Sequence, residues 1–172
     1  MSALQEAPPA GALGLMSKLS DPDALVQRLA GLPRPLVFTN GVFDLLHCGH
    51  VMYLEAARAL GASLVVAINT DRSVRGLGKG PERPLNAERD RAVVLAALAS
   101  VSLVTWFDEP TPMALLERVR PDIYVKGGDY RLEDLPEVPL VRGWGGTACV
   151  LPFLQGHSTT HLVRRLQGVP AP

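Results

Sequence analysis

Short apolar runs alternate with amphipathic stretches along most of the chain. Five runs carry apolar residues at nearly every position, which is typical of strands buried on both faces of a parallel sheet. The last-but-one of them runs into a double-glycine turn. The predicted strands lie at residues 36–38, 63–69, 101–107, 122–130 and 147–153.

Helical periodicity marks the segments between these runs. Ser20 or Asp21 with Pro22 predicts one helix start, and Asn86 predicts the cap of a helix to about Ala99 whose inward face is Val93, Val94, Ala97 and Leu98. The remaining predicted helices lie at residues 52–60, 113–120, 135–144 and 161–167. Strand, helix and strand in alternation imply right-handed crossovers. We therefore expect a Rossmann-like α/β/α sandwich with a five-stranded, mainly parallel sheet.

The domain organisation follows from the same pattern. Residues 1–19 are rich in Ala, Pro and Gly without periodicity, which predicts a flexible N-terminal arm. Residues 20–172 are then a single domain with its core at 36–167, a length at which one hydrophobic core suffices.

Composition and charge exclude several classes of function. Lys and Arg total 17, as do Asp and Glu, so no overall basic field would recruit nucleic acid or an anionic membrane. No apolar run is long enough to span a bilayer, and the first 15 residues lack the positive start of a secretory signal. The two cysteines, Cys48 and Cys149, form no disulfide framework and suit a reducing compartment. These features predict a cytoplasmic protein.

The strongest chemical signal follows the first strand. Asn40-Gly41 supplies a turn, and His47-Cys48-Gly49-His50 leads into an amphipathic helix. Unpaired N–H groups and the helix dipole favour an anion at a helix N-terminus, where two imidazoles add donors. We interpret the pair as a phosphate site. A structural cap and a zinc site are the alternatives, although a third zinc ligand at a recognisable spacing is absent.

Polar residues follow the other strands, at the edge where ligands of such sheets bind. Asn69 and Asp71 follow the second strand and Lys126, Asp129 and Tyr130 the fourth, while Ser158 predicts the cap of the last helix. Four cations, Arg72, Arg75, Lys79 and Arg83, cluster on or beside a glycine-rich loop that could close over a polyphosphate, with Lys79 the first choice. Helix capping, a surface turn and a solvated loop are the simpler alternatives.

Several sequence motifs indicate a protein family and so a more specific function. GVFDLLHCGH resembles the G-x-F-D-x-x-H-x-G-H signature of the nucleotidyltransferase superfamily that includes the cytidylyltransferases. The series NGVFDLLHCGH, AINTDRSV, KGPERPLNAERDR, VKGGDY and GHSTT resembles the D-glycero-β-D-manno-heptose 1-phosphate adenylyltransferases. Many of these are fused to a kinase domain that this chain is too short to include, so we expect the stand-alone form.

The resemblance implies transfer of AMP from ATP to the heptose phosphate, giving ADP-heptose for lipopolysaccharide or another surface polysaccharide. Its nucleophile is an ionised phosphate oxygen, so no general base is required, and Asp44 would orient a loop. Mg²⁺ would arrive with ATP, without a dedicated protein cage. The implied catalytic residues are His47, His50 and Lys79. The implied ATP- and phosphate-binding residues are Asn40, Gly41, Phe43, Gly49, Arg91, Ser158, Thr159 and Thr160. The implied substrate-binding residues are Asn69, Asp71, Arg83, Lys126, Gly127, Asp129 and Tyr130.

Other readings stay open at this point. A cytidylyltransferase of a polyol or amino-alcohol phosphate shares the histidine motif, because the motif handles phosphates rather than the base. A non-catalytic nucleotide-sensing module is a rival of another class. A homo-oligomer would cover the sheet edges, but nothing in the sequence fixes the oligomeric state.

Overall fold

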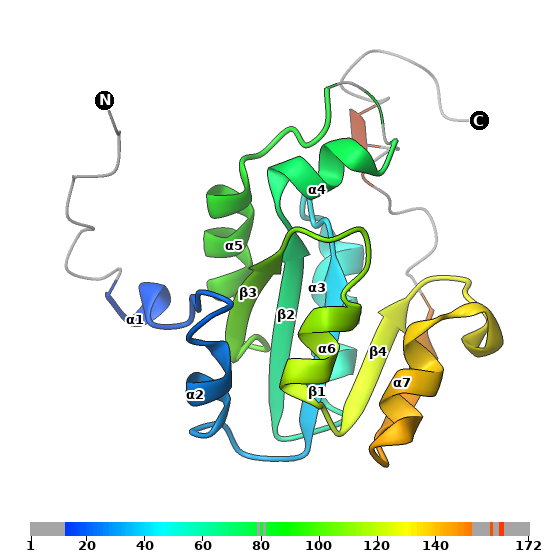
Figure 1. The fold of residues 1–172 in the computed structure, drawn as a ribbon. Helices are drawn as coiled ribbons and strands as arrows, with labels where there is room; N and C mark the ends of the chain where they lie inside the picture. Colours follow the sequence, from blue (N-terminus) through cyan, green and yellow to red (C-terminus); the bar gives the residue numbers. More distant parts are fainter. Residues whose placement is uncertain (1–12, 79, 81, 153–158, 160–161, 164–172) are drawn as a thin grey trace.

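The structure is a computed structural model that describes residues 13–78, 80, 82–152, 159, 162 and 163. Helices cover both faces of a central sheet, as predicted (Figure 1). The strands are β1 Leu36–Gly41, β2 Ser63–Asn69, β3 Leu103–Phe107, β4 Ile123–Gly127 and β5 Thr147–Leu151.

The sheet order is β3-β2-β1-β4-β5, and every neighbouring pair is parallel. All five predicted strands are therefore present. The chain moves outward from β1 to β2 and β3, then crosses back to β4 on the other side of β1. This reversal opens a crevice beside the carboxyl end of β1, which is the usual ligand position in such folds.

Alternate residues of the strands feed two separate cores. Val37, Leu64 and Val66 pack with α3 (Cys48–Arg58) and α5 (Glu88–Ala96) on one face. Phe38, Val65 and Tyr124 pack on the other face with α2, α6 and α7. The bounds of these three helices are Leu25–Leu29, Met113–Val119 and Glu137–Gly143. The period of two along each strand thus builds the three layers.

Three shorter helices complete the described chain. They are α1 (Leu13–Met16), α4 (Asp71–Gly76), which follows β2 at the end of the molecule where the strands terminate, and the 3₁₀ helix η2 (Leu132–Asp134). No helix in the described ranges is both long and apolar enough to cross a membrane.

Residues 13–19 differ from the predicted flexible arm. Leu19 bridges Val104 of the edge strand β3, with Val104 N donating to Lys18 O at 2.8 Å and Ser20 N donating to Val104 O at 2.9 Å. Leu15 also packs against the core. The arm prediction is wrong for these residues because the open edge of β3 offers them backbone partners. Residues 1–12 lie outside the described part.

Two helices begin at other residues than the sequence predicted. Helix α2 begins at Leu25 rather than near Ser20, which is held in the pairing with β3. Helix α5 is capped by Ala87, not Asn86, and its buried face is Arg91, Ala92, Leu95 and Ala96. Val94, predicted to face inward, is 50% exposed. The predicted face was wrong by two positions along the helix, because the prediction treated Arg91 as a surface residue.

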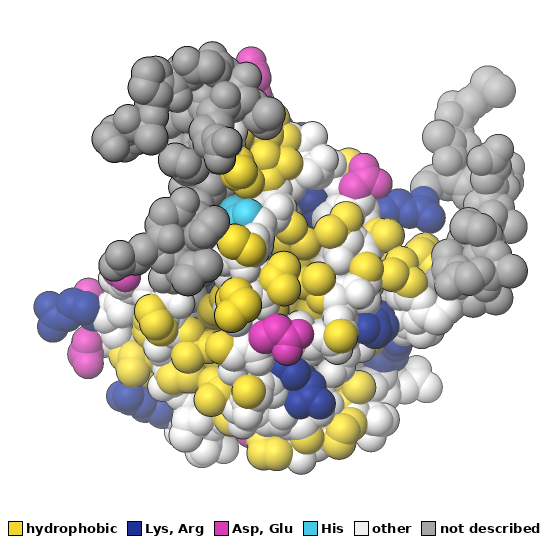
Figure 2. Space-filling model, turned by 180° about the vertical axis from the view of Figure 1, so that it is seen from behind, with side chains coloured by type: hydrophobic (Ala, Val, Ile, Leu, Met, Phe, Trp, Pro, Cys, Tyr) yellow, Lys and Arg dark blue, Asp and Glu magenta, His cyan; other side chains and the backbone are white. Residues whose placement is uncertain are grey.

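The face of the molecule seen from behind carries many apolar side chains with few charges between them (Figure 2). On α3 and α5, the layer behind the sheet in Figure 1, the large apolar side chains that stay exposed are Met52 and Val94. Scattered apolar residues are common on protein surfaces, so this face alone assigns no partner.

Candidate active site

A cavity of about 700 Å³ lies at the carboxyl ends of β1, β2 and β4. This is the position that the reversal of strand order predicts. Predicted site residues contribute much of its lining, and several other side chains complete it. The lining residues are Asn40, Gly41, Val42, Phe43, Asp44, His50, Tyr53, Asn69, Val74, Leu77, Arg83, Pro110, Thr111, Pro112, Lys126, Gly127, Tyr130, Glu137 and Thr159.

The two histidines of the motif stack on each other at the start of α3. His47 is the N-cap in an extended conformation, and His50 lies in the first turn, its N–H donating to His47 O at 2.9 Å. The ring centroids are 3.9 Å apart with 23° between the planes. His50 lines the cavity. Two imidazoles and the N-terminus of an 11-residue helix thus lie together, which suits an anion.

Phe43 fixes the other side of His50. Its ring meets the imidazole edge-on at 5.3 Å between centroids. Its backbone has φ of +48°, a left-handed conformation that costs a non-glycine residue roughly 1 kcal/mol or more. Gly41 allows this arrangement, since a Cβ there would lie 3.0 Å from the Phe43 ring. The strained backbone of Phe43 thus places its ring in contact with the His50 imidazole.

Burial controls the charge of His50. Burial, and to a smaller extent the charge of His47, lowers the pKa of His50 from 6.5 to about 4. Its Nδ1 is buried and has no hydrogen-bond partner among the described residues. At neutral pH the imidazole is therefore uncharged, and an arriving polyphosphate meets a neutral ring that donates one N–H.

Asp44 holds the segment that precedes α5. Its buried carboxylate accepts hydrogen bonds from Arg83 Nη1 at 2.6 Å, Leu85 N at 2.8 Å and Asn86 N at 3.0 Å. Its carbonyl accepts from Asn86 Nδ2 at 2.7 Å. The prediction that Asp44 orients a loop is confirmed. Arg83 lines the cavity, as expected of a substrate contact, but its guanidinium is paired with Asp44.

Arg91 does not lie where a phosphate ligand would. Its side chain is fully buried, with 0% exposed. It donates to the carbonyls of Val42 at 2.7 Å, Asn69 at 2.9 Å and Asn86 at 3.0 Å, and to Asp71 Oδ1 at 2.7 Å. All its nitrogens thus donate to protein acceptors, so the structure directs Arg91 away from the cavity, and its phosphate contact stays a prediction. Arg91 instead ties together the ends of β1 and β2 and the start of α5.

Asp71 shares this arrangement. Its carboxylate accepts from Arg91, and its backbone N–H donates to Glu88 Oε2 at 2.8 Å. It does not line the cavity, so the structure brings it to Arg91 rather than to a substrate. Asn69, which was also predicted to contact the substrate, does line the cavity and donates from Nδ2 to Ser73 Oγ at 3.0 Å.

A second group of lining residues lies at the end of β4 and just after it. Lys126, Gly127 and Tyr130 line the cavity as predicted, whereas Asp129 is exposed and lies outside the lining. Asn40 Oδ1 accepts from Tyr124 Oη at 2.9 Å and from Lys126 Nζ at 3.3 Å. Asn40 therefore links the β1 side of the cavity to the β4 side.

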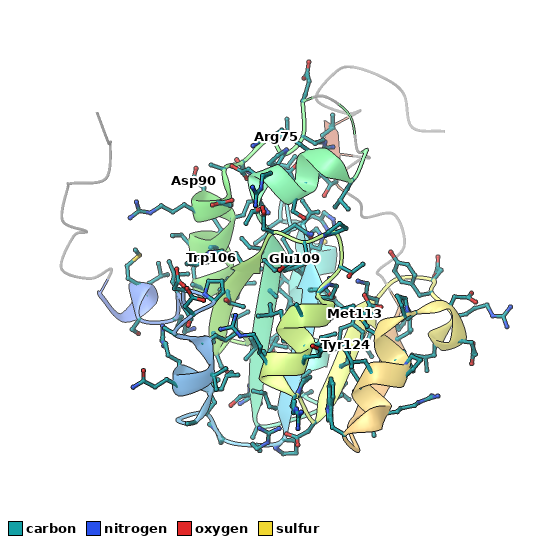
Figure 3. The ribbon with its side chains drawn as sticks, viewed as in Figure 1. Arg75, Asp90, Trp106, Glu109, Met113 and Tyr124 are labelled. Carbon is teal, nitrogen blue, oxygen red and sulfur yellow. The ribbon has the colours of Figure 1, made fainter. Side chains whose placement is uncertain are left out.

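The other cations of the glycine-rich segment lie at the same end of the molecule. Arg75 lies on α4, beyond the ends of the strands (Figure 3). Arg72 is paired with Asp108. Lys79, Ser158 and Thr160 lie outside the described residues. Thr159 lines the cavity and donates from Oγ1 to Leu45 O at 3.3 Å, while Gly49 is buried in the first turn of α3.

Sequence reasoning missed one acidic lining residue, Glu137, at the start of α7. An acid in a first helical turn usually indicates a solvated residue that complements the dipole, so no local signal distinguished it. Across the described ranges, no group of three or more His, Cys, Asp or Glu residues could hold a metal ion.

Comparisons with known proteins agree with this geometry. The model of the cytidylyltransferase-like family matches residues 38–151. A D-beta-D-heptose 1-phosphate adenylyltransferase of Bordetella bronchiseptica is 56% identical over 88% of this chain and 94% of that protein. The bifunctional protein HldE of Streptomyces coelicolor is 52% identical over 92% of this chain, which spans only 35% of that protein.

The fold has a solved counterpart. The lipopolysaccharide core biosynthesis protein from Thermoplasma volcanium GSS1 superposes with a TM-score of 0.59 at 29% sequence identity. The match covers 71% of this chain and 98% of that chain.

Proposed function

The chain belongs to the cytidylyltransferase-like family, and on that basis we propose that it is an adenylyltransferase that makes ADP-heptose. It transfers AMP from ATP to D-glycero-β-D-manno-heptose 1-phosphate and releases pyrophosphate. The Bordetella bronchiseptica relative, which this chain matches over 94% of its length, carries this activity in its name. The product would supply lipopolysaccharide or another heptose-containing surface polysaccharide.

The observation that carries the proposal is the stacked histidine pair at the start of α3, of which His50 lines a cavity of about 700 Å³. The imidazoles and the helix N-terminus would bind the α-phosphate of ATP. They would stabilise its oxygens more strongly as negative charge builds in the transition state. Lys79, Ser158, Thr159 and Thr160 remain predicted phosphate contacts.

The chemistry is a displacement at phosphorus. An ionised phosphate oxygen of the heptose 1-phosphate attacks the α-phosphorus, and the bond from that phosphorus to the bridging oxygen of pyrophosphate breaks. The nucleophile carries no proton at neutral pH, so the protein needs no general base. Its contribution is to position the two phosphates and to stabilise charge.

The donor set around the cavity suits a magnesium ion held chiefly by the triphosphate. Mg²⁺ is usually bound by one or two carboxylates together with substrate phosphates rather than by a protein cage. When bound, it would neutralise charge on the leaving pyrophosphate. Protein ligands are not assigned to it.

The test is pyrophosphate release with Mg²⁺, comparing ATP with CTP, each with and without the heptose 1-phosphate. We expect release only with ATP and only when the sugar phosphate is present. Release with CTP but not with ATP would keep the proposed phosphate chemistry and change the nucleotide. The protein would then be a cytidylyltransferase, the rival function that the family description names. ATP binding without turnover on any sugar phosphate would favour a sensing module.

The substrates proposed here are small molecules, with neither nucleic acid nor a membrane as partner. ATP and sugar phosphates are pools of the cytoplasm, where we place the reaction. A homo-oligomer stays a prediction.

A further inference from the structure

Two residues lining the cavity carry a buried side-chain atom that has no hydrogen-bond partner among the described residues. One is His50, through Nδ1, and the other is Glu137, through Oε2. The histidine belongs to the phosphate site already described. The carboxylate has no role in that site, and an acid so close to two anionic substrates requires an explanation of its own.

Burial makes the unpaired Oε2 atom of Glu137 energetically costly. Glu137 is only 4% exposed. A buried polar group without a partner costs on the order of 1–3 kcal/mol, and a charged one costs more. No ion pair with Lys or Arg is found for Glu137 in the described ranges, although Lys126 lines the same cavity. The residue therefore weakens the ligand-free fold, which is typical of groups that serve a ligand.

The surroundings identify which half of the cavity Glu137 serves. It lies in the segment after β4, and Lys126 and Gly127 at the end of β4 line the same cavity, as does Tyr130. Burial raises the pKa of Tyr124, and the nearby Glu137 charge raises it further. Tyr124 therefore stays protonated, and its Oη donates a hydrogen bond to Asn40 Oδ1 at 2.9 Å. Glu137 is therefore coupled to the β4 side of the cavity.

The chemistry of a carboxylate selects the ligand group. A carboxylate repels phosphate but accepts short, strong hydrogen bonds from hydroxyl groups. A metal would require further ligands, and no group of three candidate residues occurs in the described part. A polyhydroxylated sugar supplies many O–H donors at a distance from its phosphate. Hydroxyl groups are therefore the ligand that fits.

We propose that the Glu137 carboxylate accepts hydrogen bonds from hydroxyl groups of the acceptor sugar and so selects a polyol-bearing substrate. This inference rests on the proposed function, because it assigns a residue to the sugar half of the same site. In that role Glu137 binds the acceptor and takes no part in nucleotide binding.

The variant Glu137→Gln tests this, because it keeps the shape of the side chain and removes its charge. We expect KM for the heptose 1-phosphate to rise about 10- to 100-fold, as for loss of hydrogen bonds to a charged group. KM for ATP should change less than about twofold. Glu133→Gln is the matched control, since Glu133 is an exposed acid of the same segment.

A stability measurement separates substrate binding from a structural role. If Glu137 served the fold, its replacement would lower the melting temperature of the ligand-free protein. If it serves the sugar, Glu137→Gln should melt at the wild-type temperature or above, because it removes an unpaired buried charge. Glu137→Leu repeats this test without any hydrogen-bonding group.

The outcomes are distinct. An unchanged KM for the sugar phosphate, an equal rise in both KM values, or a lower melting temperature of both variants would overturn the inference. Absence of heptose-dependent pyrophosphate release by the wild-type protein would instead overturn the proposed function.

Discussion

Arg91 provides the sharpest test of how the site is held together. Its guanidinium is fully buried and makes four hydrogen bonds, three to carbonyls and one to Asp71. Replacement by alanine leaves these acceptors without a donor. Breaking a buried charged pair typically costs about 3–5 kcal/mol. Asp71 remains 26% exposed, so water replaces part of its lost contact. We therefore expect Arg91→Ala to lower the free energy of unfolding by roughly 4 kcal/mol.

Arg91→Lys is the milder version. A lysine keeps the charge but offers one ammonium group in place of a planar fork, so it cannot reach acceptors on three segments. We expect a loss of about 2 kcal/mol, roughly half the alanine value. Arg89→Ala is the matched control on the same helix, because Arg89 is exposed, and its effect should stay within about 0.5 kcal/mol.

The assay is urea denaturation followed by circular dichroism, with linear extrapolation to water. Kinetics with ATP are measured in parallel. If Arg91→Lys lost less than about 1 kcal/mol while KM for ATP rose tenfold or more, Arg91 would be a phosphate ligand. The positioning role described above would then be refuted. If Arg91→Ala does not fold, the lysine variant alone decides.

Three further predictions follow from the same geometry. His50→Ala should lower kcat/KM by roughly a hundredfold or more with an unchanged circular dichroism spectrum, and near-wild-type turnover would contradict the mechanism. In an NMR titration of the ligand-free protein, His50 should titrate near 4 rather than 6.5. The unfolded chain binds more protons between these values, so stability should fall as the pH drops from about 6.5 toward 4; a midpoint near 6.5 would refute the burial argument. Gly61→Ala would place a Cβ 2.5 Å from Pro35 O and 2.7 Å from Val37 Cγ2, so we expect a loss of about 1–3 kcal/mol in urea denaturation. Gly31→Ala, whose Cβ would lie 3.7 Å from the nearest such atom, is its control, and equal stability of the two variants would contradict the prediction.

The strands and the histidine site could be predicted from sequence because both are local patterns. Residues 64–68 are apolar at every position between the polar Ser63 and Asn69, which is typical of a short strand buried on both faces. The spacing of His47 and His50 places both at one helix start without reference to the rest of the chain.

Arg91 and Glu137 could not be predicted because their environments are made by distant segments. Arg91 is buried only because the carbonyls of Val42, Asn69 and Asn86 converge on it. In sequence it is one arginine among several near a helix start, where a phosphate contact is the simpler interpretation. Glu137 likewise reads as an ordinary first-turn acid until the cavity beside it is seen.

The central place of β1 in the sheet has a consequence for how this protein scaffold can change. The segment after β1 carries the histidines, whereas Lys126 lies at the end of β4 and Tyr130 and Glu137 lie in the segment after it. The two groups lie on neighbouring strands but on separate stretches of chain. Substitutions after β4 can therefore retune the choice of acceptor while the transfer machinery stays intact. Because separate segments carry the two functions, the same transfer reaction can be adapted to new acceptors. Residues 126–137 are therefore the segment to vary when engineering acceptor specificity.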